Sequence, residues 1–301
     1  MECSASIQVK APAKVNFFLK VTGKRADGYH TIASLMQKVT LYDQLELRLV
    51  DSGRIVLHCP DNALPADDTN LAYQAARIFL QTTQDRLGTS VCGVDITLVK
   101  KIPIAAGLGG GSSDAAAVLL GLNSLFGELF SEQELAGMGL QLGADVPFFV
   151  DRNAACWAEG IGELLEPVAS CNDFSIVLVN PGFSVSTKGV YENFILTSDE
   201  KSLSLTDSRI ELWRHAWQKC TYSQVFPWST LQNDLEQVTI HMHPELEGIK
   251  KDFVAQGALV AMMSGSGPTV FAVFEDRQRA QECYRFFNNQ YGSVFVTSPV
   301  T

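Results

Sequence analysis

The residues with the clearest capacity for chemistry are four closely spaced glycines and the two serines that follow them, which are Gly107, Gly109, Gly110, Gly111, Ser112 and Ser113. Glycine adopts positive φ angles and lets an anion approach the backbone without meeting a Cβ atom. The serine hydroxyls add hydrogen-bond donors at the same place. The spacing matches neither the Walker loop nor the dinucleotide fingerprint, and a bare glycine-rich turn could be only a tight connection. Three consecutive glycines before two serines nevertheless favour a phosphate-binding loop.

The segments on either side of these glycines predict a strand before them and a helix after them. Val94, Ile96 and Leu98 alternate with polar neighbours, which is the period of a half-buried strand. Residues 115–120 and Leu122 are good helix formers, and the run includes no proline. The first amides of such a helix have no intrahelical partner and lie at the positive end of its dipole, where a phosphate is stabilised. Asp114 is expected in an early turn that faces this dipole.

Three motifs, met in order along the chain, resemble those of one known family. Residues 103–116 resemble the phosphate loop of the GHMP kinases, which act on small molecules such as galactose, homoserine and mevalonate. Residues 11–19 with 25–30, and residues 264–271, are similar to the first and third motifs of one branch of that family. The likeness spans nearly the whole chain and implies an ATP-dependent kinase of a small alcohol.

The resemblance assigns catalytic roles to a lysine and an aspartate. On pattern alone, Asp145 precedes a proline by two positions and could be a cap or turn former. Lys14 lies among apolar residues and could be a strand-edge lysine whose ammonium reaches water. By resemblance, Asp145 is instead the general base for the acceptor hydroxyl. Lys14 would lie beside it, keep it ionised and steady the γ-phosphate.

Binding roles follow from the same likeness. ATP is the expected phosphoryl donor, and its implied binding residues are Pro103, Gly107, Leu108, Gly109, Gly110, Gly111, Ser112, Ser113, Lys101 and Asn70. For Asn70, an ordinary polar residue of a first helical turn is the alternative. Mg²⁺ is expected with the triphosphate because it neutralises the phosphate charge, and its protein ligands are unknown.

The implied acceptor is 4-diphosphocytidyl-2-C-methyl-D-erythritol, a small molecule of the non-mevalonate isoprenoid pathway. Asn16, Tyr29 and His30 would face its cytidine diphosphate end. The alternative for Tyr29 and His30 is a plain hairpin loop, because they follow an Asp-Gly turn. Gly265, Ser266 and Gly267 would pack beside the phosphate loop and shape the site, with a plain glycine hairpin as the alternative.

Composition and charge limit the partners. The chain has 301 residues, 46% hydrophobic and 19% charged, which is ordinary globular composition. A net charge of −10 without a Lys/Arg cluster argues against nucleic acid. Seven scattered cysteines without a Cys-x-x-Cys pair predict reduced thiols rather than a disulfide framework or a zinc site. With no apolar run of bilayer length and no export segment, we expect a cytoplasmic protein, without a membrane partner, as a monomer or homodimer.

We predict an α+β protein of two domains, the GHMP kinase fold. Residues 1–165 would form an N-terminal ATP-binding and catalytic domain, which by resemblance is ribosomal-S5-like and carries the glycine loop. Residues 166–301 would form a C-terminal ferredoxin-like domain, because their element order reads βαββαβ with added helices.

Several element boundaries are also predicted. Residues 6–21 are expected to form two strands or one bent strand, broken at Pro12, and further strands are expected over 34–41, 44–50 and 54–58. One helix would be capped by Asp68 or Thr69 and run to about Thr83. Another would open with a capping box at Ser131 and Glu134 and run to about Leu142.

Two other functions compete with this interpretation. A kinase of another alcohol, such as homoserine or a mevalonate derivative, is disfavoured by the Asp-Gly-Tyr-His segment and the Pro-Ala-Lys-Val-Asn start. A non-catalytic nucleotide-binding relative is disfavoured because both Lys14 and Asp145 are present.

Overall fold

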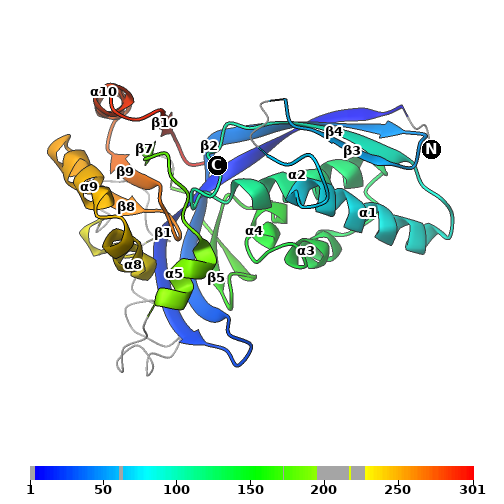
Figure 1. Ribbon diagram of the computed structural model, residues 1–301, viewed down its shortest axis with the longest axis horizontal. Coiled ribbons are helices and arrows are strands. Elements are labelled where there is room, and N and C mark those ends of the chain that lie inside the picture. The colour runs from blue at the N-terminus through cyan, green and yellow to red at the C-terminus, as the bar shows by residue number, and fades with distance from the viewer. Residues whose placement is uncertain (1–3, 61–63, 172, 195–216, 218–227) are drawn as a thin grey trace. The chain divides into compact units, whose positions relative to one another are not determined.

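The computed structural model describes residues 4–60, 64–171, 173–194, 217 and 228–301, and they fall into two compact units that alternate along the chain (Figure 1). Unit 1 comprises Met1–Ala13, Leu41–Ile102 and Gly109–Arg152. Unit 2 comprises Lys14–Thr40, Pro103–Leu108 and Asn153–Thr301. The domain boundary near residue 165 stays a prediction.

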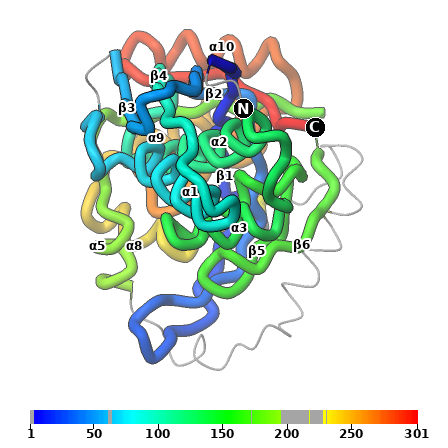
Figure 2. Tube along the Cα trace, turned by 90° about the vertical axis from the view of Figure 1, so that its right-hand side faces the viewer, coloured from blue at the N-terminus to red at the C-terminus, as the bar shows by residue number. Residues whose placement is uncertain are grey.

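Unit 1 combines strands with a layer of helices. The second half of β2 (His30–Val50) pairs antiparallel with β4 (Gly93–Val99), and β3 (Ile55–His58) pairs parallel with β4. Four helices cover one face of these strands: α1 (Leu71–Leu87), α2 (Gly110–Leu125), α3 (Glu132–Leu140) and α4 (Val146–Val150). α1 packs along α2 (Figure 2), and α4 packs against both α2 and α3. This layer holds the glycine loop at the start of α2.

The first two strands are longer than the sequence predicts. β1 (Ser6–Lys24) passes through Pro12 without a break, and β2 runs on through the predicted gap at residues 42 and 43. In the sheet β1 pairs with β2, off the path of the other strands. An edge strand tolerates a proline because one side of its backbone needs no ladder partner.

The predicted helix boundaries are partly right. The capping box at Ser131 and Glu134 is confirmed, although α3 ends at Leu140. The cap of α1 is wrong: Asn70, not Asp68 or Thr69, accepts from the amide of Ala72, and the helix extends to Leu87. Sequence patterns place helix ends poorly because several neighbouring residues can cap equally well.

Unit 2 contains a second, fully antiparallel sheet with the order β10-β7-β9-β8. Its strands are β7 (Ser175–Asn180), β8 (Val260–Met263), β9 (Val270–Phe274) and β10 (Ser293–Thr297). Its helical elements are α5 (Thr187–Asn193), the 3₁₀ turn η2 (Trp228–Thr230), α8 (Asp234–Met242), α9 (Glu245–Ala255) and α10 (Arg277–Asn288). Numbered within this sheet, the strand order is 4-1-3-2, which is that of the predicted ferredoxin-like fold.

Unit 2 also contains the first half of β2, which the sequence did not pair. It runs antiparallel to β5 (Ala155–Glu159), and β5 runs antiparallel to β6 (Leu164–Val168). The segment after β10 joins this group, because the amide of Val300 donates to the carbonyl of Lys38 and Thr40 donates to the carbonyl of Ser298. Gln37 reinforces the junction with a side-chain bond to the carbonyl of Val300.

The prediction of reduced thiols holds for four cysteines and is wrong for one. Cys59, Cys156, Cys171 and Cys283 are not disulfide-bonded, whereas Cys92 is. Spacing along the chain does not reveal which cysteines meet in space, so the sequence could not predict this bond. Among the described residues, the structure contains no helix long and apolar enough to cross a membrane.

Candidate functional site

The second half of the glycine loop forms the N-terminus of α2 in unit 1. The helix begins at Gly110, so two of the three consecutive glycines lie in its first turn. Gly109 is the N-cap, with a φ of 70°, and has no side chain to cap the helix. The early amides are therefore left to an external acceptor, as a phosphate-binding helix start requires.

A side chain at Gly110 would be packed very tightly against its surroundings. A Cβ atom there would lie 3.0 Å from Cγ2 of Ile102 and 3.3 Å from Nζ of Lys100. The backbone at the helix start is thus packed against the strand end that precedes the loop. Only glycine permits this approach without displacing either neighbour.

The first half of the loop is held inside unit 2 by the Ser-Gly-Ser-Gly turn between β8 and β9. Ser264 donates its hydroxyl to the carbonyl of Gly107 at 3.0 Å, and the amide of Thr269 donates to the carbonyl of Ala106 at 3.3 Å. Gly107 has a φ of 75°, and a Cβ atom there would lie 2.1 Å from the carbonyl oxygen of Ser264. The turn thus lies directly against Gly107.

Lys14 is buried in unit 2 and is not the water-facing lysine of the alternative interpretation. It is 4% exposed, and its ammonium donates to Oδ1 of Asn16. Asn16 in turn donates to the hydroxyl of Ser34 at 2.8 Å, and Ser34 donates to the carbonyl of Phe18 at 2.7 Å. The backbone amide of Lys14 donates to the carbonyl of Leu108 at 3.0 Å, which ties the lysine to the loop.

Asn233 is a further residue at this place, and the sequence analysis missed it. Its side-chain amide donates to the carbonyls of Met263 and Gly265, at 2.8 and 2.7 Å, while its oxygen caps α8. A Cβ atom on Gly265 would lie 3.4 Å from Nζ of Lys14. Asn233 therefore holds the turn that packs on Lys14. An asparagine before an apolar helix is a recognisable cap signal, but its second set of contacts leaves no mark in the sequence.

Asp145 lies in unit 1 at the N-cap position of α4, and its side chain makes no capping hydrogen bond. The interpretation of Asp145 as a simple cap is therefore wrong. α4 begins at Val146, and Pro147 lies in its first turn, where a helix tolerates proline. A Cβ atom on nearby Gly143 would lie 4.0 Å from the hydroxyl of Ser112, so the Asp145 turn approaches the start of α2. The pairing of Asp145 with Lys14 stays a prediction.

A buried cluster of charges lies beneath the start of α2. Lys100 pairs with both Asp43 and Asp114, and its ammonium lies 2.7 Å from Oδ2 of Asp114. The three side chains are 8%, 0% and 2% exposed, in the order Lys100, Asp43 and Asp114. Burial raises the pKa of Asp114 to about 7, Lys100 opposes this rise, and Asp43 adds to it.

Asp114 lies early in α2, as expected, because the helix begins at Gly110 and Asp114 is in its second turn. One oxygen of its carboxylate pairs with Lys100. Among the described residues, two buried polar side-chain atoms have no hydrogen-bond partner, the hydroxyl of Ser113 and Oδ1 of Asp114. Both belong to the helix start, which is where a polar ligand would be expected to supply partners.

The residues assigned to the cytidine end lie in unit 2, at the hairpin between β1 and β2. Tyr29 is 61% exposed. His30 is buried and stacks on Tyr191 of α5, with ring centroids 5.3 Å apart, and meets the ring of Phe194 edge-on. Burial and the charge of Lys24 lower the pKa of His30, which favours a neutral imidazole. Tyr191 was not predicted, since nothing in the sequence links α5 to this hairpin.

The remaining nucleotide residues have structural contacts of their own. Asn70 caps α1 and donates its amide to the carbonyl of Pro65 at 2.9 Å, so its contact with a nucleotide stays a prediction. Lys101 has an exposed side chain, and its backbone amide donates to Asp43. Pro103 is half-buried.

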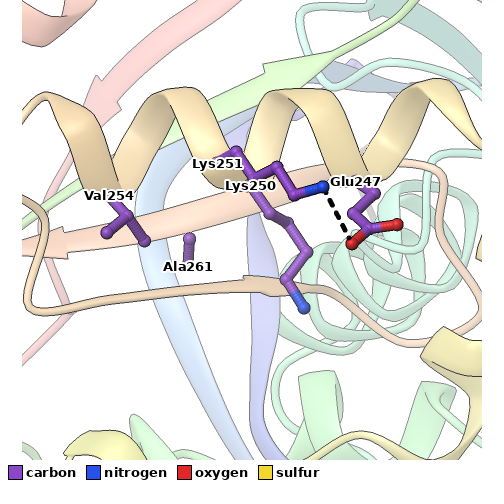
Figure 3. A pocket seen from close by; sticks show the side chains of 5 residues that line it. All are labelled: Glu247, Lys250, Lys251, Val254 and Ala261. Atoms are coloured by element: carbon purple, nitrogen blue, oxygen red, sulfur yellow. Dashed lines mark ion pairs between the residues drawn. The ribbon is translucent and has the colours of Figure 1, made fainter.

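Outside the loop and the hairpin, the described residues form a hollow but no cluster of metal-binding side chains. The described part of the chain contains no group of three or more His, Cys, Asp or Glu side chains that could hold a metal ion. A shallow hollow of about 330 Å³ lies on α9 and β8, lined by Glu247, Lys250, Lys251, Val254 and Ala261 (Figure 3). Lys251 forms an ion pair with Glu247 across one helical turn, at 3.2 Å, and none of the predicted site residues lines the hollow.

Comparison with known proteins relates the whole chain to one group. Residues 70–152 match the model of the GHMP kinases N-terminal domain, and residues 223–293 match that of the GHMP kinases C-terminal domain. A 4-diphosphocytidyl-2-C-methyl-D-erythritol kinase of Desulfotalea psychrophila is 41% identical over 99% of this chain and 97% of its own length. The same-named protein of Pelobacter propionicus is 45% identical over 92% of both.

Solved structures agree with the sequence comparison. A crystal structure of 4-(cytidine 5'-diphospho)-2C-methyl-D-erythritol kinase matches with a TM-score of 0.78 and 33% identity, over 98% of this chain and 100% of its own. A homoserine kinase from Cytophaga hutchinsonii matches with a TM-score of 0.74 over 99% and 96%. Because the identity is only 21%, this match shows a shared fold and nothing about function.

Proposed function

The chain belongs to the GHMP kinase family, and from that premise we propose that it transfers the γ-phosphoryl group of ATP to the 2-hydroxyl of 4-diphosphocytidyl-2-C-methyl-D-erythritol. The other product is ADP. This is a kinase reaction of the non-mevalonate route to isoprenoid precursors. The predicted α+β fold of two GHMP kinase domains is confirmed by the same family matches.

One observation carries the choice of acceptor. The similarity to relatives named for this substrate extends over 92–99% of the chain at 41–45% identity. It therefore includes the segments around Asn16, Tyr29 and His30 as well as the glycine loop. A likeness confined to the loop would support ATP binding without indicating which alcohol is phosphorylated.

The glycine loop provides the donor site in this proposal. The open amides at the start of α2 and the dipole of that helix hold the nucleotide phosphates and stabilise the charge that spreads over the transferring phosphoryl group. The hydroxyls of Ser112 and Ser113 are further donors. The unpartnered, buried hydroxyl of Ser113 fits this role, since a phosphate oxygen would complete its bonding.

Asp145 and Lys14 carry the proton and charge in the reaction. The acceptor hydroxyl oxygen attacks the γ-phosphorus, and the bond from that phosphorus to the bridging oxygen of ADP breaks. Asp145 takes the hydroxyl proton. Lys14 favours the ionised form of Asp145 and stabilises the γ-phosphate. The buried position of Lys14 supports this role, because a charge acts more strongly where water is excluded.

The aromatic group around His30 provides the acceptor site. Exposed Tyr29 and the stacked ring of Tyr191 can each pack on a flat pyrimidine. A neutral His30 can both donate and accept a hydrogen bond at the edge of the base. Asn16 lies between this group and Lys14 along β1, so the diphosphate and the alcohol would extend in that direction.

Mg²⁺ enters with the nucleotide and supplies neutralisation of the triphosphate charge. The described residues contain no cluster of metal-binding side chains, so we assign the ion no protein ligand and derive no step from it.

The experiment that tests the function is ADP release by the purified protein with ATP and Mg²⁺, with and without 4-diphosphocytidyl-2-C-methyl-D-erythritol. Homoserine and mevalonate serve as control alcohols. We expect ADP release that depends on the cytidylated substrate alone. Release with a control alcohol instead would preserve the kinase class and overturn the assignment of the acceptor. Tight ATP binding without ADP release from any alcohol would point to a non-catalytic relative.

A further inference from the structure

A fully buried carboxylate on β2 is bonded to the segment that leads into the glycine loop. Oδ1 of Asp43 accepts hydrogen bonds from the amides of Lys101 and Ile102, the latter at 2.9 Å. Its other oxygen pairs with the ammonium of Lys100. Asp43 itself is 0% exposed. One side chain thus bonds three consecutive residues of the loop approach.

The position of Asp43 explains why a side chain is needed there. The β2–β4 ladder includes the pair Gln44 and Val99, and Asp43 is the next residue of β2 beyond that pair. The amides of Lys101 and Ile102 lie just past the end of β4, where the chain turns toward the loop. Buried amides require an acceptor, and the carboxylate of Asp43 provides one where the backbone ladder no longer does.

Lys100 extends the connection to α2. Its ammonium lies 2.7 Å from the carboxylate of Asp114 in the second turn of that helix, and within 3.3 Å of the place that a Cβ atom on Gly110 would occupy. The end of β4 and the start of α2 are therefore joined by one ammonium between two carboxylates. The segment that contains the glycine loop begins at the end of β4 and ends at the start of α2.

We propose that Asp43 is a positioning residue for the nucleotide phosphates, acting through Lys100 and the amides of residues 101 and 102. It contacts no substrate itself; it fixes the end of β4 against the start of α2, so that the open amides keep the geometry that a phosphate needs. This inference rests on the proposed function, since ATP is the ligand of those amides.

Stability alone gives a poor reason for this cluster. Removing three charged groups from water is costly, and a buried ion pair is commonly no more stable than a well-packed apolar replacement. What such a cluster supplies is a defined geometry, because each charged hydrogen bond is directional and strong. A loop that must present several amides to one anion needs the positions of those amides to be fixed in this way.

The test compares Asp43→Asn with a matched control, Asp95→Asn. Asp95 lies on β4 and pairs with Arg48 of β2 at 2.7 Å on the exposed side, so its loss removes a carboxylate from the same pair of strands. Asp43→Asn keeps an oxygen for the two amides and removes the charge that holds Lys100. We expect a rise of about tenfold in the Kd of a non-hydrolysable ATP analogue, as for the loss of one charged hydrogen bond.

The KM for the acceptor should stay within about twofold, and the control should match the wild type in both measurements. A double-mutant cycle with Lys100→Met adds a second readout. If Asp43 acts through Lys100, the effects on the Kd of the analogue are strongly non-additive. The same cycle with Asp114→Asn reports on the other end of the cluster if Asp43→Asn fails to fold.

Three results would overturn the role of Asp43. The first is an unchanged Kd for the analogue in Asp43→Asn with only a lower melting temperature. The second is an equal rise in the Kd of the analogue and the KM of the acceptor. The third is additive effects in both cycles. A wild-type protein that binds no analogue at all would overturn the proposed function, and the positioning role with it.

Discussion

Each unit of this molecule buries one lysine next to part of the glycine loop, and the two lysines are held differently. Lys100 in unit 1 lies between the carboxylates of Asp43 and Asp114. Lys14 in unit 2 donates to the neutral amide of Asn16, which continues into a hydroxyl and a backbone carbonyl. The first arrangement depends on charge. In the second, hydrogen bonds through Asn16 and Ser34 continue from the ammonium into neutral groups.

This difference predicts different responses to substitution. Replacing aspartate with asparagine removes the negative charge with little change of shape. In a charged cluster, the loss of charge alone should therefore weaken the hydrogen bonds that remain. A neutral network responds instead to the loss of a donor or acceptor, whatever the charge. The predictions below use this contrast, from the largest expected effect to the smallest.

The largest effect is expected where charge takes part in the reaction. Asp145→Asn should lower kcat by about 10²–10⁴-fold, since an amide cannot accept the hydroxyl proton. The affinity for ATP should stay within a few-fold. Steady-state kinetics and nucleotide titration measure the two effects, and Asp85→Asn on the exposed side of α1 is the control. A variant that keeps most of its kcat would remove Asp145 from the role of general base.

Lys14→Met tests the corresponding charge in unit 2. The side chain keeps its length but loses the ammonium, so kcat should fall by about 10²-fold through lost stabilisation of the γ-phosphate. Lys251→Met, on the exposed face of α9, should behave as the wild type. A variant that loses acceptor affinity but not kcat would make Lys14 a binding residue rather than a catalytic one.

His30→Ala tests a neutral side chain of unit 2. The loss of a stacked, hydrogen-bonding ring should raise the KM for the cytidylated substrate by about tenfold, the size expected for 1–1.5 kcal/mol of aromatic contact. The KM for ATP should change little. His58→Ala, exposed on β3, is the control. Equal increases in both KM values would argue against a pyrimidine site at His30.

The smallest effect concerns pH and the charged cluster. The pKa of Asp114 is raised from 3.8 to about 7 in the folded protein, so between these values the folded state holds a proton that the unfolded chain has released. Stability should therefore fall as pH rises through this window and level off above pH 7. Asp114→Asn should remove that part of the pH dependence.

Melting temperatures at pH 5 and pH 8 provide the measurement. On going from pH 5 to pH 8, the melting temperature of the wild type should fall more than that of Asp114→Asn. Each kcal/mol of unfolding free energy corresponds to roughly 2–4 °C. Asp95→Asn should keep the wild-type pH dependence, because its carboxylate is paired on the surface. Identical pH dependence in all three proteins would show that Asp114 titrates normally.

The sequence predicts the local features of this molecule well. The glycine loop between β4 and α2, the capping box of α3 and the order of strands and helices along residues 166–301 all follow from short patterns whose physical causes lie within a few residues. The length of β2 was underestimated: the sequence predicts two strands with residues 42 and 43 between them, whereas one strand runs from His30 to Val50.

What the sequence could not predict depends on contacts between distant residues. Asp43 lies 57 positions before Lys100, and Asn233 lies 32 positions before Gly265. Neither belongs to a motif, because each acts by supplying a hydrogen bond at a place that only the folded chain defines. Tyr191 is missed for the same reason. Positions that orient a site rather than form it thus escape pattern recognition.

Because the segment after β10 pairs with β2, unit 2 cannot finish folding until nearly the whole chain has been synthesised. The hydroxyl of Thr40 accepts from the amide of Ser298, 258 residues later. At a synthesis rate of roughly 5–20 residues per second, Thr40 is synthesised about 13–50 s before Ser298. β7 likewise waits for both of its neighbours in the second sheet, β9 and β10. During that interval the apolar faces of unit 2 are uncovered, so this half of the protein should depend on chaperones more than unit 1 does.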